Sequence, residues 1–145
     1  MPAQSAVAIR VVDWSEAQPL VTPLRTMVFV VEQHVPIELE LDESDVRSRH
    51  AIATDATGKV IGTGRLLPDG HIGRMAVALA ARGRGVGSQL LLRLMDEAAS
   101  RGFSHAHLNA QLSAQGFYAR HGFVAHGPVY MDAGIEHIAM SRKLG

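Results

Sequence analysis

A run of glycine and arginine between an expected strand and an expected helix constrains this chain more than any other feature. The run is Arg82-Gly83-Arg84-Gly85-Val86-Gly87, between strand-like residues 72–77 and strongly helical residues 86–101. Glycines at alternate positions let the backbone approach a ligand closely, and amide N–H groups at the start of a helix favour an anion. The two arginines add positive charge and forked donors. The run therefore predicts a binding site for a diphosphate.

Two other phosphate-binding loops do not fit this run. A P-loop would end in Gly-Lys-Ser or Gly-Lys-Thr, whereas Gly87 is followed by Ser88. The dinucleotide pattern Gly-x-Gly-x-x-Gly fails because the sixth position from Gly83 is Ser88 and that from Gly85 is Leu90. The structural alternative is a flexible loop that merely happens to be rich in glycine and arginine.

Length and composition indicate one globular domain, which we expect to span residues 1–145. Apolar residues make up 47% of the chain, and 14 basic residues balance 14 acidic ones, so no general attraction to nucleic acid is expected. The absence of cysteine excludes disulfides and a cysteine nucleophile. No apolar stretch approaches the ~18 residues of a membrane span, and no signal peptide is evident, so we expect a cytoplasmic protein without membrane contact.

The pattern of apolar residues and turns predicts a mixed α/β (α+β) fold. Helices are expected at 20–33, with Pro23 in the first turn, and at 86–101 and 113–121, while the acidic residues 34–48 are expected to form a loop with room for a short helical turn. The strand that follows the central helix should lie parallel to the one before it. Strands are expected at residues 6–12, 50–54, 60–67, 71–77, 103–109, 123–125 and 136–142.

With these elements in order, the chain resembles the GNAT superfamily of N-acetyltransferases. Residues 73–77 are similar to the strand that holds pantetheine, and residues 82–87 fit the pyrophosphate loop Gln/Arg-x-x-Gly-x-Gly/Ala. Asn109 and residues 116–123 resemble the closing motif with its Phe-Tyr-x-x-x-Gly-Phe spacing. The resemblance implies a mixed, mostly antiparallel sheet of about six or seven strands, with helices on both faces and a splay between strands four and five.

Two further segments, residues 28–33 and 134–140, resemble a bacterial subgroup of small, single-domain GNAT proteins. The resemblance implies acetyl-CoA as co-substrate, with the backbone of Met75, Ala76 and Val77 bonding its pantetheine arm and polarising the thioester. Asn109 and Arg120 are expected to contact pantetheine and a phosphate, or else only backbone and solvent. The residues expected around the pyrophosphate are Arg82, Gly83, Arg84, Gly85, Val86, Gly87 and Ser88.

Tyr118 is the expected general acid, because the departing CoA thiolate must be protonated. A free phenol has a pKa near ~10 and a thiol one near ~8.5, so this proton transfer is mildly uphill. The alternative role of Tyr118 is that of a core aromatic side chain packed beside Phe117. The closing motif favours the acid.

The base for the acceptor amine has three candidates. His71 lies at the start of strand four, where some family members carry a carboxylate, and imidazole titrates in a suitable range. It could equally be an ordinary residue of the hairpin that follows residues 68–70. Glu32 is the second candidate, because it follows a helix that looks buried. A chain of water molecules is the third.

Other charged residues leave further alternatives open. Arg65 and Arg74 lie in or beside central strands, where they could bind a substrate carboxylate or phosphate, or form structural ion pairs. The acidic residues 38–45 could attract a cationic amine or simply face solvent. His105 and His107 share a strand face, but no carboxylate or cysteine cluster accompanies them, so we expect no metal.

The sequence thus predicts an acetyl-CoA-dependent N-acetyltransferase in which a primary amine attacks directly in a ternary complex. Its partner would be a small-molecule amine or a peptide acceptor, whose identity the sequence leaves open. Homodimers are common in the family, so a homodimer is a further expectation. The alternatives are a non-catalytic module that binds or senses acyl-CoA, and a protein-interaction domain.

Overall fold

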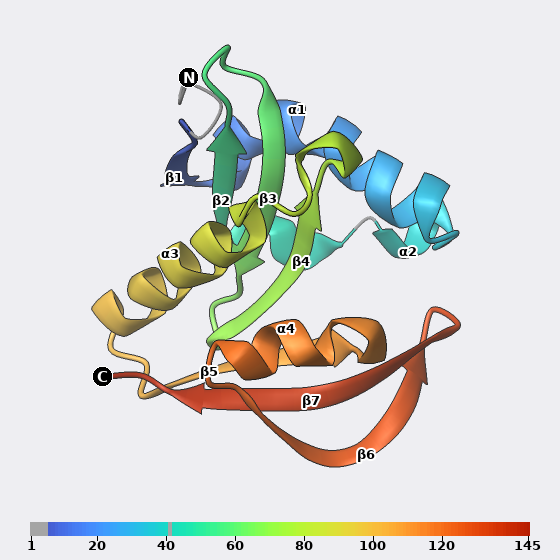
Figure 1. The fold of residues 1–145 in the computed structure, drawn as a ribbon, viewed down its shortest axis with the longest axis vertical. Helices are drawn as coiled ribbons and strands as arrows, with labels where there is room; N and C mark the ends of the chain where they lie inside the picture. The colour runs from blue at the N-terminus through green and yellow to red at the C-terminus, as the bar shows by residue number, and fades with distance from the viewer. Residues whose placement is uncertain (1–5, 41) are drawn as a thin grey trace.

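The computed structural model describes residues 6–40 and 42–145, which are arranged around a seven-stranded sheet (Figure 1). The strands are β1 Ala8–Val12, β2 Arg49–Thr54, β3 Val60–Leu66, β4 His71–Val77, β5 His105–Gln111, β6 Val124–Asp132 and β7 Ile135–Lys143. The helices are α1 Trp14–Arg25, α2 Ile37–Glu40, α3 Val86–Ser100 and α4 Gln115–Arg120. None of the described helices is long and apolar enough to cross a membrane.

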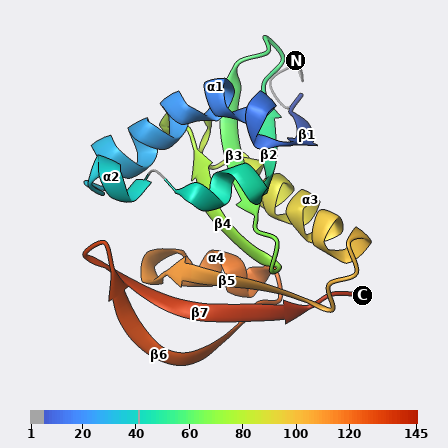
Figure 2. The same ribbon diagram turned by 180° about the vertical axis from the view of Figure 1, so that it is seen from behind.

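The sheet has the order β1-β2-β3-β4-β5-β7-β6, and among the described strands only β4 and β5 pair in parallel. The helix α3 makes the crossover between these two strands. Helices α3 and α4 lie on one side of the sheet, whereas α1 and α2 lie on the other, as the two opposite views show (Figures 1 and 2). The predicted fold, a mixed and mostly antiparallel sheet with a splay between strands four and five, is confirmed.

Helix α3 supplies much of the core, as its apolar stripe predicts. Leu90, Leu91 and Leu94 are fully buried, and each such side chain stabilises the fold by about 1.5–3 kcal/mol. The helix can approach the sheet closely because β3 carries glycine at two positions beneath it. A Cβ at Gly62 would lie 2.8 Å from Leu90 Cδ1, and one at Gly64 would lie 2.9 Å from Leu94 Cδ1.

The first helix begins earlier than residue 20, so that predicted boundary is wrong. Asp13 caps α1, because its carboxylate accepts a hydrogen bond from the backbone N–H of Glu16 at 3.3 Å. Pro19 and Pro23 both lie inside this helix, which continues as a π-helical segment over Thr26–Glu32. Two prolines disfavour a helix locally, so burial of its inner face decides the outcome.

Two other segments also contain more regular structure than the sequence predicts. The expected loop at 34–48 contains α2 and a 3₁₀ helix, Glu43–Arg47. Strand β6 extends to Asp132, far beyond the predicted 123–125. Gly127-Pro128 falls inside it, where the register shifts, and an edge strand tolerates a proline because its outer N–H groups need no partner strand.

Candidate functional site

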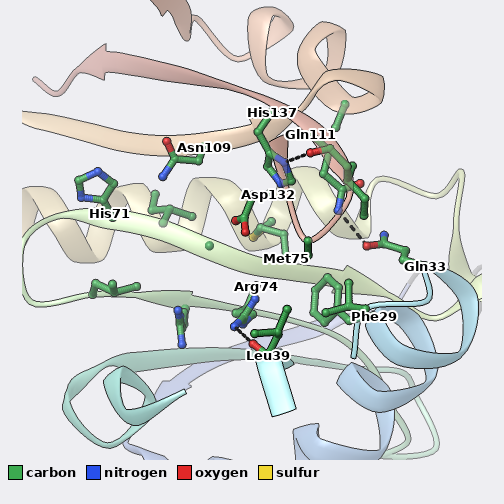
Figure 3. A pocket seen from close by; sticks show the side chains of 18 of the residues that line it. Phe29, Gln33, Leu39, His71, Arg74, Met75, Asn109, Gln111, Asp132 and His137 are labelled. Carbon is green, nitrogen blue, oxygen red and sulfur yellow. Dashed lines mark hydrogen bonds between the residues drawn. The ribbon is translucent and has the colours of Figure 1, made fainter. Parts of the chain in front are cut away.

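The splay between β4 and β5 opens the main cleft of the molecule. The two strands pair only through His71 with His107 and Ile72 with Leu108, and then diverge. Beyond Ile72, the edge of β4 that faces β5 has no strand partner in the described part of the chain. Its backbone N–H and C=O groups therefore need other partners, which a ligand can supply. The opening has a volume of about 680 Å³ (Figure 3).

A β-bulge shapes the wall of this cleft. Gly64 of β3 lies opposite two residues of β4, Arg74 and Met75. Arg74 has a φ of 49°, a left-handed conformation that costs a residue with a Cβ roughly 1–2 kcal/mol. Such bulges bend a strand and redirect its side chains. The predicted pantetheine-binding residues, Met75 to Val77, follow directly, and Met75 lines the cleft while Val77 lines a second pocket.

This second pocket, of about 400 Å³, lies over the glycine run. Gly83 and Gly85 have φ values of 81° and 79°, which a side chain would strain. No described side chain caps the N-terminus of α3 at Gly85, so the first N–H groups of this helix, in residues that line the pocket, are available as hydrogen-bond donors. Residues predicted from the sequence line the pocket, without Arg84: Val77, Arg82, Gly83, Gly85, Val86, Gly87, Ser88 and Arg120.

Hydrogen bonds to neighbouring groups hold the side chains of the two loop arginines in place. Arg82 donates from Nε to the carbonyl of Val77 at 2.9 Å and from Nη2 to Glu32 at 2.7 Å. Arg84 donates to the carbonyl of Ala80 at 2.7 Å. Glu32, a candidate base, is therefore an ion-pair partner of Arg82 in the glycine loop, and it is not among the residues that line the main cleft.

Tyr118 lies where α4 borders the cleft, as predicted for the general acid. Its neighbour Phe117 lines the loop pocket, so α4 stands at the junction of the two pockets. The Tyr118 ring makes edge contacts with Phe117 and Phe123, with centroids 5.1 and 6.0 Å apart. Burial raises the pKa of Tyr118 to about 12. The phenol therefore stays protonated at neutral pH but is a weaker acid than a free tyrosine.

His71 lines the cleft at the point where the strands part. Its Nδ1 lies 3.0 Å from a carboxylate oxygen of Asp69, which also accepts the backbone N–H of His71. A carboxylate can only accept, so Nδ1 carries the hydrogen and Nε2 is left with its lone pair. Burial raises the pKa of Asp69, but hydrogen bonds from His71 outweigh it and lower that pKa overall. The Asp69 carboxylate therefore fixes the orientation of the His71 ring.

Sequence reasoning missed five polar residues that line the cleft, namely Asp69, Gln33, Gln111, Asp132 and His137. Gln111 donates to Gln33 at 2.8 Å, joining β5 to the end of the π-helical segment (Figure 3). His137 donates from Nδ1 to the carbonyl of Ile135 at 2.7 Å. Gln111 could have been found, because it shares a strand face with Asn109, which also lines the cleft. The place of His137 and Asp132 in the cleft could not be predicted without knowing the register of β6 and β7.

Beneath the cleft, three arginines and three carboxylates form one network. Arg25 donates to Glu40 at 2.6 Å and to Asp45 at 2.9 and 3.0 Å, and its side chain is 2% exposed. Arg65 donates to Asp45 at 2.9 Å and to Asp42 at 2.7 Å. The network anchors the acidic segment against β3, and two of its arginines, Arg65 and Arg74, reach the cleft wall.

The histidines of β5 stack rather than converge. His107 stacks on His71 and on His105, with ring centroids 5.3 and 6.2 Å apart. Burial lowers the pKa of His107, and the neighbouring histidines lower it further. Among the described residues, no group of three or more histidine, cysteine or carboxylate side chains is placed to hold a metal ion.

Comparison with known proteins agrees with this geometry. An acetyltransferase (GNAT) domain model matches residues 16–144. The uncharacterized N-acetyltransferase YjcF of Bacillus subtilis is 39% identical over 82% of this chain and 87% of its own length. An acyl-CoA N-acyltransferase from Pseudomonas aeruginosa superposes with a TM-score of 0.84 at 33% identity, covering 94% and 99% of the chains. Escherichia coli ElaA superposes equally well, at 29% identity over 94% and 99%.

A mixed sheet that parts between two parallel strands, next to a glycine loop at a helix N-terminus, defines the acyl-CoA N-acyltransferase class of folds. The chain belongs to the GNAT acetyltransferase family.

Proposed function

We propose that the protein transfers an acetyl group from acetyl-CoA to a primary amine by direct attack within a ternary complex. The observation that carries the proposal is the junction of the two pockets. One pocket offers free helix N–H groups for a diphosphate, and the other offers an unpaired strand edge for a thioester and room for an acceptor. Met75, Val77 and the Phe117-Tyr118 pair lie where the two pockets adjoin.

The chain's own groups account for binding of this co-substrate. The loop from Arg82 to Ser88 would hold the pyrophosphate, and Arg120 lies close enough to add charge. The free N–H groups after the bulge would bond pantetheine, and one of them would polarise the thioester carbonyl, which makes its carbon more electrophilic. Asn109, exposed on β5 across the cleft, would complete the pantetheine channel.

His71 would accept the proton that the acceptor ammonium must lose, and Asp69 would stabilise the resulting imidazolium. The amine nitrogen then forms a bond to the carbonyl carbon, and the carbon–sulfur bond breaks. Tyr118 would give its proton to the departing thiolate and recover one from solvent or from the new amide nitrogen. The raised pKa of Tyr118 ensures that the proton is present but makes its transfer more uphill.

The test is release of CoA, followed with a thiol reagent, over a panel of primary amines and peptides. We expect turnover with at least one acceptor, and a Tyr118→Phe variant with a kcat lowered by about 10²-fold or more and unchanged affinity for acetyl-CoA. Tyr130→Phe is the matched control, because Tyr130 lies on β6 and is not among the cleft-lining residues. If the protein binds acetyl-CoA but releases no CoA in the presence of any acceptor, turnover is contradicted and the protein is a sensing module.

A further inference from the structure

The cleft wall that faces α2 carries a positive charge that the carboxylates of the protein neutralise only in part. We infer that the acceptor is an amine that also bears a carboxylate, an amino-acid-like molecule, and that Arg74 binds this carboxylate. The inference rests on the proposed function and narrows its substrate class. It follows from a comparison of the two arginines that line the cleft, Arg65 and Arg74.

Arg65 is fully engaged at its terminal nitrogens. Nη1 donates to Asp45 at 2.9 Å and Nη2 donates to Asp42 at 2.7 Å, and the residue is 7% exposed. Two carboxylates therefore neutralise this guanidinium at hydrogen-bond distance. An incoming anion would compete with groups that are already in place, so Arg65 serves as structure rather than as a binding group.

Arg74 differs in each of these respects. Its hydrogen bonds run from Nη2 to the neutral carbonyl of Leu39 at 3.1 Å (Figure 3) and to that of Glu40 at 3.4 Å. The one carboxylate among the described residues within ion-pair distance of Arg74 is that of Asp42, at 3.6 Å, and Asp42 is already bonded to Arg65. Nε lacks a partner within that part of the chain in both arginines, but a quarter of the Arg74 side chain is exposed whereas the Arg65 side chain is almost fully buried.

The surroundings of Arg74 favour an added negative charge. Burial lowers the pKa of Arg74, and the positive charges of Arg65 and Arg25 lower it further, against the opposing effect of Glu40 and Asp42. A guanidinium remains charged at neutral pH even when its pKa is lowered. Binding of an anion would therefore reduce the positive potential around Arg74. Arg74 also sits in the strained left-handed conformation of the bulge, and such strain is concentrated at binding sites.

The other side of the cleft supplies the complementary charge. Asp132 lines it from the end of β6 and forms no ion pair with another described residue, while His137 and Gln111 offer polar atoms beside it (Figure 3). These groups favour a positively charged ligand, while a carboxylate is favoured near Arg74 and the reacting amine must reach the Asp69–His71 pair, which lines the same cleft. The volume of about 680 Å³ is within the range of small-molecule sites. A small zwitterion would match both signs at once.

The first test uses the unaltered protein and does not depend on turnover. N-acetyl amino acids and their N-acetyl amides are titrated by calorimetry into protein loaded with CoA, across a panel of side chains. We expect the best carboxylate to bind about tenfold or more tightly than its own amide, since hydrogen bonds to charged groups are worth about 1.5–3 kcal/mol. Equal affinities throughout, or preference for the amides, would overturn the inference.

Variants then assign the effect to a residue. Arg74→Gln should abolish the preference for the carboxylate and Arg74→Lys should retain part of it, whereas Arg93→Gln, on the exposed face of α3, should leave it intact. A preference that survives Arg74→Gln in a folded protein would place the anion elsewhere. Binding of CoA is measured in the same samples: its absence refutes the proposed function, whereas CoA binding with turnover of neutral amines alone refutes only the carboxylate site.

Discussion

Two histidines of the cleft have one ring nitrogen already committed to a hydrogen bond. His71 donates from Nδ1 to the Asp69 carboxylate, and His137 donates from Nδ1 to a backbone carbonyl. In both, the neutral ring therefore presents Nε2 as an acceptor. The difference lies in the partner, because a carboxylate stabilises the protonated ring far more than a carbonyl does. This favours His71 as the base.

Replacement of His71 by alanine should lower kcat about 10²- to 10⁴-fold, with the acetyl-CoA affinity unchanged. The reason is that the acceptor ammonium loses its oriented proton acceptor. The acidic limb of the pH–rate profile should flatten, and Asp69→Asn should show a smaller loss in the same limb. If His137→Ala produced these effects while His71→Ala kept the wild-type profile, the two assignments would have to be exchanged.

Gly85 offers a second prediction at the level of one residue. Its φ of 79° lies in the left-handed region, so Gly85→Ala should destabilise the protein by about 1–2 kcal/mol and weaken binding of CoA. Urea unfolding and calorimetry measure the two effects. Gly116→Ala is the matched control, because Gly116 lies in α4 without a positive φ and its Cβ would meet nothing closer than 3.6 Å. An unaffected Gly85→Ala variant would contradict the role of the loop.

At the scale of elements, the buried ion network determines where the acidic segment lies. Arg25 joins the end of α1 to Glu40 in α2 and to Asp45 in the following 3₁₀ helix. Arg25→Met should lower the free energy of unfolding by about 3–5 kcal/mol, because it leaves Glu40 buried without its ion-pair partner and removes one of the two guanidinium groups that neutralise Asp45. Arg10→Met, which removes an exposed pair with Glu16, should cost at most about 1 kcal/mol. Similar losses in urea unfolding for both variants would contradict this account.

The same elements show what a sequence can and cannot predict. The stripe of α3 and the glycine loop are local patterns, so the helix, the place of the loop before it and the neighbouring strand could be predicted. The acidic segment looks like a solvated loop, because the arginines that neutralise Asp45 lie about 20 residues away on either side. His137 reaches the cleft only through its pairing with Gln111 across β7 and β5, which no local pattern specifies.

At the scale of the whole molecule, the account requires that one ligand engages two pockets together. Hydrogen–deuterium exchange with and without CoA tests this most directly, because it reports on the backbone N–H groups that are assigned to binding. The account predicts saturable protection at residues 75–77 and at the loop and α3 start, 83–88, with little change in β1 and β2. No protection at either segment in folded protein at millimolar CoA, or protection confined to other strands, would contradict it.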